Sequence, residues 1–459
     1  MTKLISVLFY LLLIKSSLAS AFFNENKYDS NTLLLDDLIQ LVLVNSYDVK
    51  TSKIERQIAV QNVGQQLSEF YPRLDVSLGL SNIKKFGNIP GIDSVLLQGQ
   101  DDINSANAVA SLSLNLYRGG YNMSAYKASV IGKNFSNQKI KHVRFLVIKE
   151  LIELYHSLKS AKINYKIANL KLILEKKYLT MNLIAFKDGT ITAVAVEKNK
   201  DKIQNIEAAL IHYDYKAKTY NSILLELSGK NNVVNNINST EEESQEIIVN
   251  TLNENYIDIL KSLNIKKGKN FELLQLEQEY KKAKYEIDKA KSKYKPKIDL
   301  STQYTYSALD QDNIINAYRD ITKDKRQIGL IISWNIFEGF ATDTGYRTAQ
   351  LRRQKLKVNI LNKQRKLFND KKQITLKISS INENIYKQRN EMNLYEIELK
   401  IMQQEYKHGL INKLDMHNKM TKIKIIELEI IDKENQVNLL EVDKFALGTM
   451  NLSFNKGNR

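Results

Sequence analysis

The sequence predicts a mainly α-helical fold with a membrane β-barrel portion, in which one unit, a β-hairpin followed by a long helical hairpin, occurs twice. The duplication is visible directly: residues 116–119 match residues 336–339, and residues 186–189 match residues 406–409, in both cases 220 positions apart. Each half contains two runs in which apolar and polar residues alternate, as they do in strands. Each half also contains long proline-free stretches with apolar residues three and four positions apart, as in helices.

The first 21 residues are typical of a secretory signal peptide. Lys3 supplies a positive charge, residues 4–14 form an apolar run too short to span a bilayer, and Ala19-Ser20-Ala21 is a small-residue cleavage site. We expect an exported chain that begins near Phe22, and the alternative is a buried N-terminal helix. Since no other segment approaches the ~20 apolar residues of a membrane helix, an integral membrane role must use strands.

Charge and cysteine content exclude several classes of protein. The net charge is +17, but the lysines are spread among glutamates along helical segments, which indicates a solvated basic surface and not a nucleic-acid interface. The chain has no cysteine, so disulfides, thiol chemistry and lipidation of an N-terminal cysteine are excluded.

Each repeat is expected to contain a leading helix, two strands and two antiparallel helices. In the first repeat, residues 22–229, these elements cover about 32–71, 73–86, 106–117, 118–188 and 191–228. In the second repeat, residues 256–450, they cover about 256–295, 297–308, 327–337, 338–408 and 411–448. A polar linker, residues 230–255, joins the repeats, and residues 451–459 form a C-terminal tail.

Proline and glycine mark the boundaries of these elements. Of three prolines in the chain, Pro72 and Pro296 stand at matching positions before a strand, where they end the leading helices. Gly189 and Gly409 stand at matching positions after the longest helices, where each allows a sharp turn.

The alternating runs are typical of membrane barrel strands. Leu74, Val76, Leu78 and Leu80 alternate with small or polar residues, and the other three runs do the same over about ten residues. Aromatic residues stand at the helix-side ends of the strands, where an interfacial belt is expected: Tyr71, Tyr117, Tyr294 and Phe337. The alternative is a half-buried sheet in a soluble protein, because the signal from each strand is weak.

The helix lengths predict a wall of constant thickness. A helix over residues 118–188 is roughly 100 Å long at ~1.5 Å per residue, and the helix over residues 338–408 has the same length. The leading and returning helices are each about half as long. Two half-length helices stacked end to end match one long helix, so we expect the chain breaks at mid-height.

Four strands cannot close a barrel, since outer-membrane barrels start at about eight strands. Membrane strands must therefore pair with other subunits. Two copies give eight strands and three give twelve, and the larger number leaves room for a passage.

These residues together resemble the TolC-type outer membrane efflux protein family, over nearly the whole mature chain. The resemblance rests on the strand starts at 72–75 and 296–299, the strand ends at 117–120 and 337–339, and the turn at 406–411. It implies a homotrimer with a twelve-stranded barrel in outer membrane lipid and a periplasmic α-helical tunnel. It further implies a passive duct for efflux or type I protein secretion, working with a periplasmic adaptor and an inner-membrane pump.

The resemblance also implies where the periplasmic entrance and its gate lie. The hairpin tips, Gly189 with Thr190 and Gly409 with Leu410, would contact the adaptor. Tyr406 matches the gate tyrosine of the best-known members, Asp415 matches their first acidic ring, and Asn418 stands where the second acidic residue would be. Ile411 and Ala195 replace the arginine and the first-hairpin aspartate, so the family's salt-bridged latch is not preserved. Three Asp415 carboxylates around an axis would form a cation-attracting constriction.

Two other classes of function remain as alternatives. A periplasmic or surface coiled-coil protein, structural or adhesive, would have the same long helices with soluble strands. An enzyme is not favoured, because the sequence has no glycine-rich phosphate loop and no nucleophile elbow. None of the five histidines forms an i, i+4 metal-ligand pair, so we expect neither a metal nor a cofactor.

Overall fold

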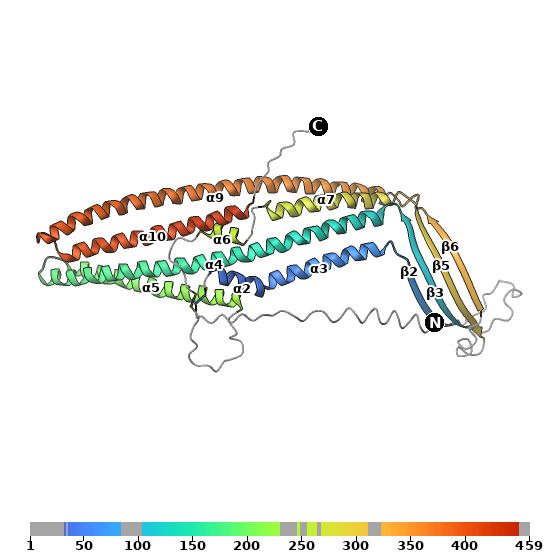
Figure 1. The fold of residues 1–459 in the computed structure, drawn as a ribbon, viewed down its shortest axis with the longest axis horizontal. Coiled ribbons are helices and arrows are strands. Elements are labelled where there is room, and N and C mark those ends of the chain that lie inside the picture. Colours follow the sequence, from blue (N-terminus) through green and yellow to red (C-terminus); the bar gives the residue numbers. More distant parts are fainter. Residues whose placement is uncertain are drawn as a thin grey trace, which may run out of the picture.

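The computed structural model describes residues 32–33, 35–83, 103–229, 246–247, 255–263, 268–310 and 323–448. The expected signal peptide, the C-terminal tail and most of the linker lie outside these residues. The described chain is elongated, with a four-stranded sheet at one end and all the long helices running away from it (Figure 1).

The two longest helices are equivalent elements of the two repeats. The helix α4 (Tyr121–Lys187) and the helix α9 (Ala341–Lys407) each contain 67 residues and begin 220 positions apart. Each turns back into a shorter helix, α5 (Ala193–Ser228) or α10 (Lys413–Ala446). The predicted helical hairpins are confirmed, and their tips lie at the end opposite the sheet (Figure 1).

The leading helices are interrupted, and here the expectation of continuous helices was wrong. The first is divided into α2 (Leu35–Asn45) and α3 (Tyr47–Ser68), and the second into α6 (Tyr256–Ser262) and α7 (Phe271–Ser292). Ser46 and Asn270, which occupy equivalent positions, cap the second pieces by accepting hydrogen bonds from the amides of Val49 and Leu273. Such caps compete with helix continuation because their side chains satisfy amides that would otherwise bond to a preceding turn.

The half-length helices stack end to end, as predicted. Along α4 lie α5 toward the tip and α3 toward the sheet, and along α9 lie α10 and α7 in the same arrangement (Figure 1). The long helix α4 also contacts α7 and α10, so it joins the two repeats. The wall therefore runs in the order α3 and α5, then α4, then α7 and α10, then α9.

The hydrophobic core is concentrated at mid-height, where the half-length helices meet. Its largest cluster joins α2, the middle of α4, and the ends of α5, α6 and α10. Leu38, Leu151 and Leu224 are completely buried there. Full burial of such a side chain stabilises the fold by about 1.5–3 kcal/mol, so this cluster fixes the height at which the helix ends meet.

The sheet contains the strands β2 (Arg73–Ile83), β3 (Ile103–Arg118), β5 (Lys297–Asp310) and β6 (Lys323–Ser333) in that order, all antiparallel. The two hairpins have the same register: Arg73 is opposite Ser113 in the first, and the equivalent Lys297 is opposite Ser333 in the second. A short parallel pair, β1 (Thr32–Leu33) with β4 (Glu246–Ile247), forms a separate two-stranded sheet.

Three of the four strands lie close to their predicted positions, whereas the fourth is shifted. The sequence predicts a strand over about 327–337, but β6 ends at Ser333 and residues 334–337 form no regular structure. The neighbouring strand β5 begins at Lys297, opposite Ser333, so residues 334–337 have no strand beside them among the described residues. Their alternation is strand-like, but a strand also needs a partner for its backbone groups.

Candidate functional site

The sheet has one face that is apolar and exposed. Alternate residues of the edge strands project apolar side chains to this face, each at least 58% exposed: Leu74, Val76, Leu78, Leu80, Ile328, Leu330 and Ile332. Cross-strand pairing continues the rows across the sheet, with Leu74 opposite Leu112 and Leu300 opposite Leu330. Soluble monomers rarely expose such a continuous apolar surface, which marks a site of contact with lipid or protein.

The opposite face is polar. Ser111 of β3 lies between Asp75 of β2 and Gln303 of β5, and Ser113 lies between Arg73 and Ser301. Ile331 is an apolar exception on β6. The alternation predicted from the sequence is therefore confirmed, and it gives the sheet a lipid-type face and a water-type face.

The four predicted interfacial aromatics lie where the sheet joins the helices. Tyr71 and Phe337 are 61% and 70% exposed, and Tyr117 and Tyr294 are 39% and 44% exposed. Trp334, which the sequence prediction placed inside a strand, lies at the same level, and its indole nitrogen donates to the carbonyl oxygen of Tyr294 at 3.1 Å. A belt of partly exposed aromatic side chains with polar atoms is typical of a membrane–water boundary.

Both helical hairpin tips are built by the same backbone motif. Gly189 has φ +73° and donates to the carbonyl of Phe186, while Thr190 donates to the carbonyl of Ala185 at 2.9 Å. Gly409 and Leu410 repeat this arrangement, with φ +73° at the glycine and 2.9 Å from the Leu410 nitrogen to the carbonyl oxygen of Glu405. This is the Schellman arrangement, in which a residue with positive φ ends the helix. Glycine is favoured because a Cβ atom is strained at this backbone conformation.

The predicted gate residues are gathered at the second tip, but with different exposure. Tyr406 lies in the last turn of α9, Ile411 lies in the connection between the helices, and Asp415 and Asn418 lie in the first turns of α10. Asp415 is exposed, whereas Asn418 is 5% exposed and its Oδ1 atom has no hydrogen-bond partner within the described ranges. Asp415 thus presents a carboxylate to solvent at the tip, whereas Asn418 is a neutral amide buried within the hairpin.

Polar contacts inside the tips were not predicted from the sequence. In the first hairpin, buried Asn199 of α5 donates to Glu175 of α4 at 2.8 Å. In the second hairpin, Lys419 of α10 pairs with Glu398 of α9 and lies 3.7 Å from the ring centroid of Tyr395. A polar residue at an apolar position of the helical period was the sequence signal that could have predicted these contacts. The contacts fix each pair of helices near its tip.

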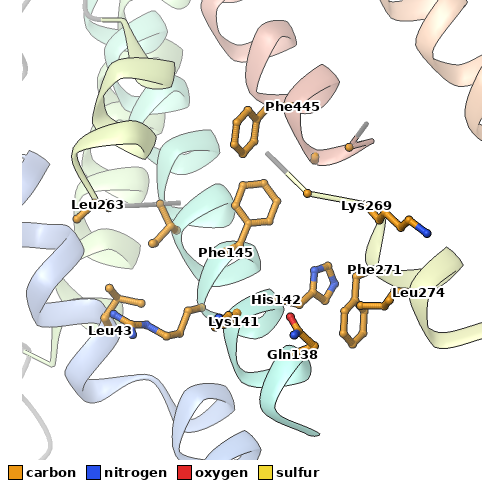
Figure 2. A pocket seen from close by; sticks show the side chains of 15 residues that line it. Leu43, Gln138, Lys141, His142, Phe145, Leu263, Lys269, Phe271, Leu274 and Phe445 are labelled. Carbon is orange, nitrogen blue, oxygen red and sulfur yellow. The ribbon is translucent and has the colours of Figure 1, made fainter. Parts of the chain in front are cut away.

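A cavity of about 690 Å³ lies at mid-height, between the two repeats. Figure 2 shows Phe145 of α4 facing Phe445 of α10, and His142 of α4 directed toward Phe271 of α7. The His142 and Phe271 rings stack with centroids 4.0 Å apart. Burial lowers the pKa of His142 below 6.5, although nearby Glu272 acts in the opposite direction. Burial therefore favours the neutral form of the His142 imidazole. Its main role is to pack against Phe271 where α4 meets α7.

A second partly buried histidine lies between α4 and α10. Burial lowers the pKa of His156 below 6.5; Asp432 opposes this shift and Lys159 adds to it. Its Nδ1 atom finds no hydrogen-bond partner in the described part of the chain. Across the same described residues, no group of three or more acidic or histidine side chains could hold a metal ion. No described helix contains a stretch long and apolar enough to cross a membrane.

These features define a class of protein: a chain that joins a membrane-type sheet to a long helical wall with turned tips at its far end. A family model described as outer membrane efflux protein matches residues 38–230 and 264–441, most of the chain and one match in each repeat. The chain therefore belongs to the outer membrane efflux protein family. Comparison with curated protein sequences gives no match.

Several solved structures share this fold along nearly the whole chain. The outer membrane channel CmeC of Campylobacter jejuni is 17% identical with a TM-score of 0.68, covering 94% of this chain and 93% of its own. The outer membrane protein VceC of Vibrio cholerae is 15% identical with a TM-score of 0.67, covering 90% and 96%. The open MtrE outer membrane channel of Neisseria gonorrhoeae is 15% identical with a TM-score of 0.63, covering 95% and 97%. At these identities the likeness concerns the fold.

Proposed function

We propose that three copies of this chain form a closed outer-membrane duct, a passive conduit for efflux or type I protein secretion. The twelve strands would form the barrel, with the apolar face toward lipid and the polar face toward a water-filled passage. The helical walls would form a tunnel in the periplasm. The N-terminal signal peptide would direct export of the chain.

The observation that carries this proposal is the unequal burial of two equivalent helices. The helix α4, which has neighbours on both sides, buries eighteen residues, whereas α9, of equal length, buries three. Along α9 many large apolar side chains are more than half exposed, among them Leu351, Val358, Leu361, Phe368 and Leu394. The helix α9 is equivalent to α4 but is uncovered on one side. This difference favours a neighbouring helix supplied by another copy of the chain.

The tips would serve as the periplasmic entrance. Gly189 with Thr190 and Gly409 with Leu410 would contact a periplasmic adaptor, which in turn joins an inner-membrane pump. The 74% exposure of Leu410 supports this role. Asp415 would line a constriction near Tyr406 and Ile411, with buried Asn418 behind it in the hairpin. No reaction chemistry is assigned to the chain, because its proposed role is passage.

Planar-bilayer conductance of the purified, detergent-extracted oligomer tests the proposal. A trimeric duct should give stable single-channel currents, and the protein should resist salt extraction from membranes and require detergent. A protein that salt releases from membranes and that conducts nothing would instead support the coiled-coil alternative, in which the exposed apolar face serves a structural or adhesive assembly.

A further inference from the structure

The cavity at mid-height has aromatic walls. Phe145 of α4, Phe271 of α7 and Phe445 of α10 line it, and Figure 2 shows the three rings around the same space. The ring of Phe145 is 9% exposed, and Ile148 and Leu274 extend the apolar lining. A cavity of this size, with apolar and aromatic walls and a few polar groups, is typical of a site for a small molecule.

The polar side of the cavity comes from one stretch of α4. Gln138, Lys141 and Arg144 line it at intervals of three residues, which places them on neighbouring turns of the helix. Lys141 and Arg144 are exposed, and neither has an ion-pair or hydrogen-bond partner among the described residues. The cavity therefore has two positive charges on its polar side that no described acidic side chain neutralises.

Acidic side chains near the cavity are paired with other cations. Glu272, whose charge acts on His142, forms an ion pair with Lys363 of α9. Glu277 pairs with Lys269 at 3.3 Å. The helix α7 also begins at the cavity, and the N-terminal end of a helix carries a partial positive charge. The electrostatic surroundings of the cavity thus favour a negative group.

The second repeat lacks these residues. At the equivalent positions of α9, 220 residues further on, Leu361 replaces Lys141 and Gln364 replaces Arg144. The helix α9 nevertheless has the same length as α4. A long helix of this kind therefore does not need the two cations, and in the first repeat they occur where the aromatic cavity lies.

We propose that this cavity binds a small amphipathic anion, with a flat apolar body among the three phenylalanines and an acidic head group held by Lys141 and Arg144. A guanidinium donates two parallel hydrogen bonds to a carboxylate or a sulfonate, and an ammonium adds a point charge. Aromatic rings favour a flat apolar body because they stack on it or meet it edge to face.

The position of the cavity favours a water-soluble ligand over a membrane lipid. The helix α4 begins beside the sheet at Tyr121, and residues 121–142 span roughly 32 Å at ~1.5 Å per residue. A lipid in a bilayer around the sheet does not reach this height. The site lies within one chain, so it does not depend on the proposed trimer.

Dye binding to the purified full-length protein tests the site. The probe is anilinonaphthalene sulfonate, and its matched analogue is phenylnaphthylamine, which has the same apolar body without the acidic group. Trp334 is the only tryptophan and lies at the sheet end. Trp334→Phe with Phe135→Trp moves the tryptophan beside the cavity, since Phe135 stacks on Phe271 with centroids 5.2 Å apart. Energy transfer to the dye should then saturate at one dye per chain.

Removal of the two cations is the decisive change. In this reporter chain, Lys141→Gln with Arg144→Gln should weaken binding of the sulfonate about tenfold or more, because its charge-assisted hydrogen bonds are lost. The neutral analogue should bind about equally to both forms. The control is Lys198→Gln with Lys202→Gln, which removes the same charge from exposed positions of α5. It should leave the affinity within about twofold, and an equal loss in both double variants would contradict a local site.

Titration calorimetry of the chain with its natural Phe135 and Trp334 repeats the comparison if the reporter variant does not fold. Absence of saturable binding in calorimetry would overturn the site. Equal affinity for the two probes would overturn the selection of an acidic head group. A third outcome concerns the acidic linker: Glu241→Gln, Glu242→Gln and Glu243→Gln together should leave the affinity unchanged. A tenfold gain would mean that the linker itself occupies the cavity, in place of a small molecule.

Discussion

The backbone of Gly119 lies directly against the carbonyl oxygen of Ser292, where the end of β3 meets the end of α7. Gly119 has φ +64°, and a Cβ atom there would lie 2.4 Å from that oxygen and 3.0 Å from the Cβ atom of Lys295. The contact joins the two repeats at the level where the sheet meets the helical wall.

The first prediction is that Gly119→Ala destabilises the chain by more than ~3 kcal/mol, the range in which strained backbone and a backbone clash combine. Gly120→Ala adds a Cβ atom at a similar backbone conformation with nothing within 4 Å, so it should cost only ~1–2 kcal/mol. Urea unfolding of both variants, followed by far-ultraviolet circular dichroism, measures the difference. Equal costs would mean that the backbone at Gly119 shifts to relieve the clash.

Lys149 connects α4 to α10. Its Nζ atom lies 2.7 Å from Glu153 and 2.9 Å from Asp443, and its side chain is 23% exposed. Burial lowers the pKa of Lys149, but the hydrogen bonds to Glu153 and Asp443 outweigh it, so the pKa rises above 10.5. The ion pair's contribution is therefore fully present below pH 10.5 and is lost as the pH rises through the higher folded-state pKa.

We predict that Lys149→Met lowers the free energy of unfolding by ~1–2 kcal/mol at neutral pH, because two carboxylates lose their cation. Lys218→Met is the control, since Lys218 pairs with Asp214 within one exposed helix face and should show no measurable loss. The same urea titration compares them. If Lys149→Met were as stable as the wild type, the link between α4 and α10 would depend on apolar packing alone.

The sequence was sufficient for the features that repeat. Matching positions at Pro72 and Pro296, and at Gly189 and Gly409, located the two units, and the alternation identified which strand face is apolar. The helix lengths then predicted breaks at mid-height. These inferences succeed because period, turn residues and length are local properties of the chain.

What the sequence did not reveal depends on nonlocal partners or on competing local signals. The breaks at Ser46 and Asn270 were missed because apolar periodicity continues across them. A helix-start signal was nevertheless present at both breaks, since each capping residue is followed two positions later by an acidic residue in the first turn. Residues 334–337 alternate like a strand but have no strand beside them in the chain. The link from Lys149 to Asp443 joins residues 294 positions apart, which no periodicity predicts.

A third prediction concerns acid sensitivity. The folded-state pKa of His156 is below 6.5, so between that pKa and pH 6.5 the unfolded chain binds more protons than the folded chain. Stability should therefore be constant above pH 6.5 and fall as the pH decreases through this window. His156→Gln should reduce the fall, measured as the difference in urea midpoint between pH 7.5 and pH 5.

His142 contributes in the same direction, because burial lowers its pKa also. The pH dependence of the urea midpoint should therefore fall in the His156→Gln variant relative to the wild type, but it should not vanish. His212→Gln, at an exposed position of α5, is the control and should keep the wild-type slope. A His156→Gln variant with an unchanged slope would show that this histidine has the same pKa in the folded and the unfolded chain, with Asp432 offsetting the effect of burial.

The last prediction concerns ion selectivity at the proposed entrance. In a trimer, three exposed Asp415 carboxylates would surround the axis, and a unit charge about 6 Å from a passing ion contributes ~0.7 kcal/mol even in water. Asp415→Asn should therefore lower the cation-to-anion permeability ratio at least about threefold, measured from the reversal potential in a salt gradient across a planar bilayer. Asp214→Asn, far from the tip on α5, should leave the ratio unchanged. Channels that conduct normally with the same ratio in both variants would remove Asp415 from the constriction while leaving the duct itself intact, since the selectivity would then come from another part of the passage.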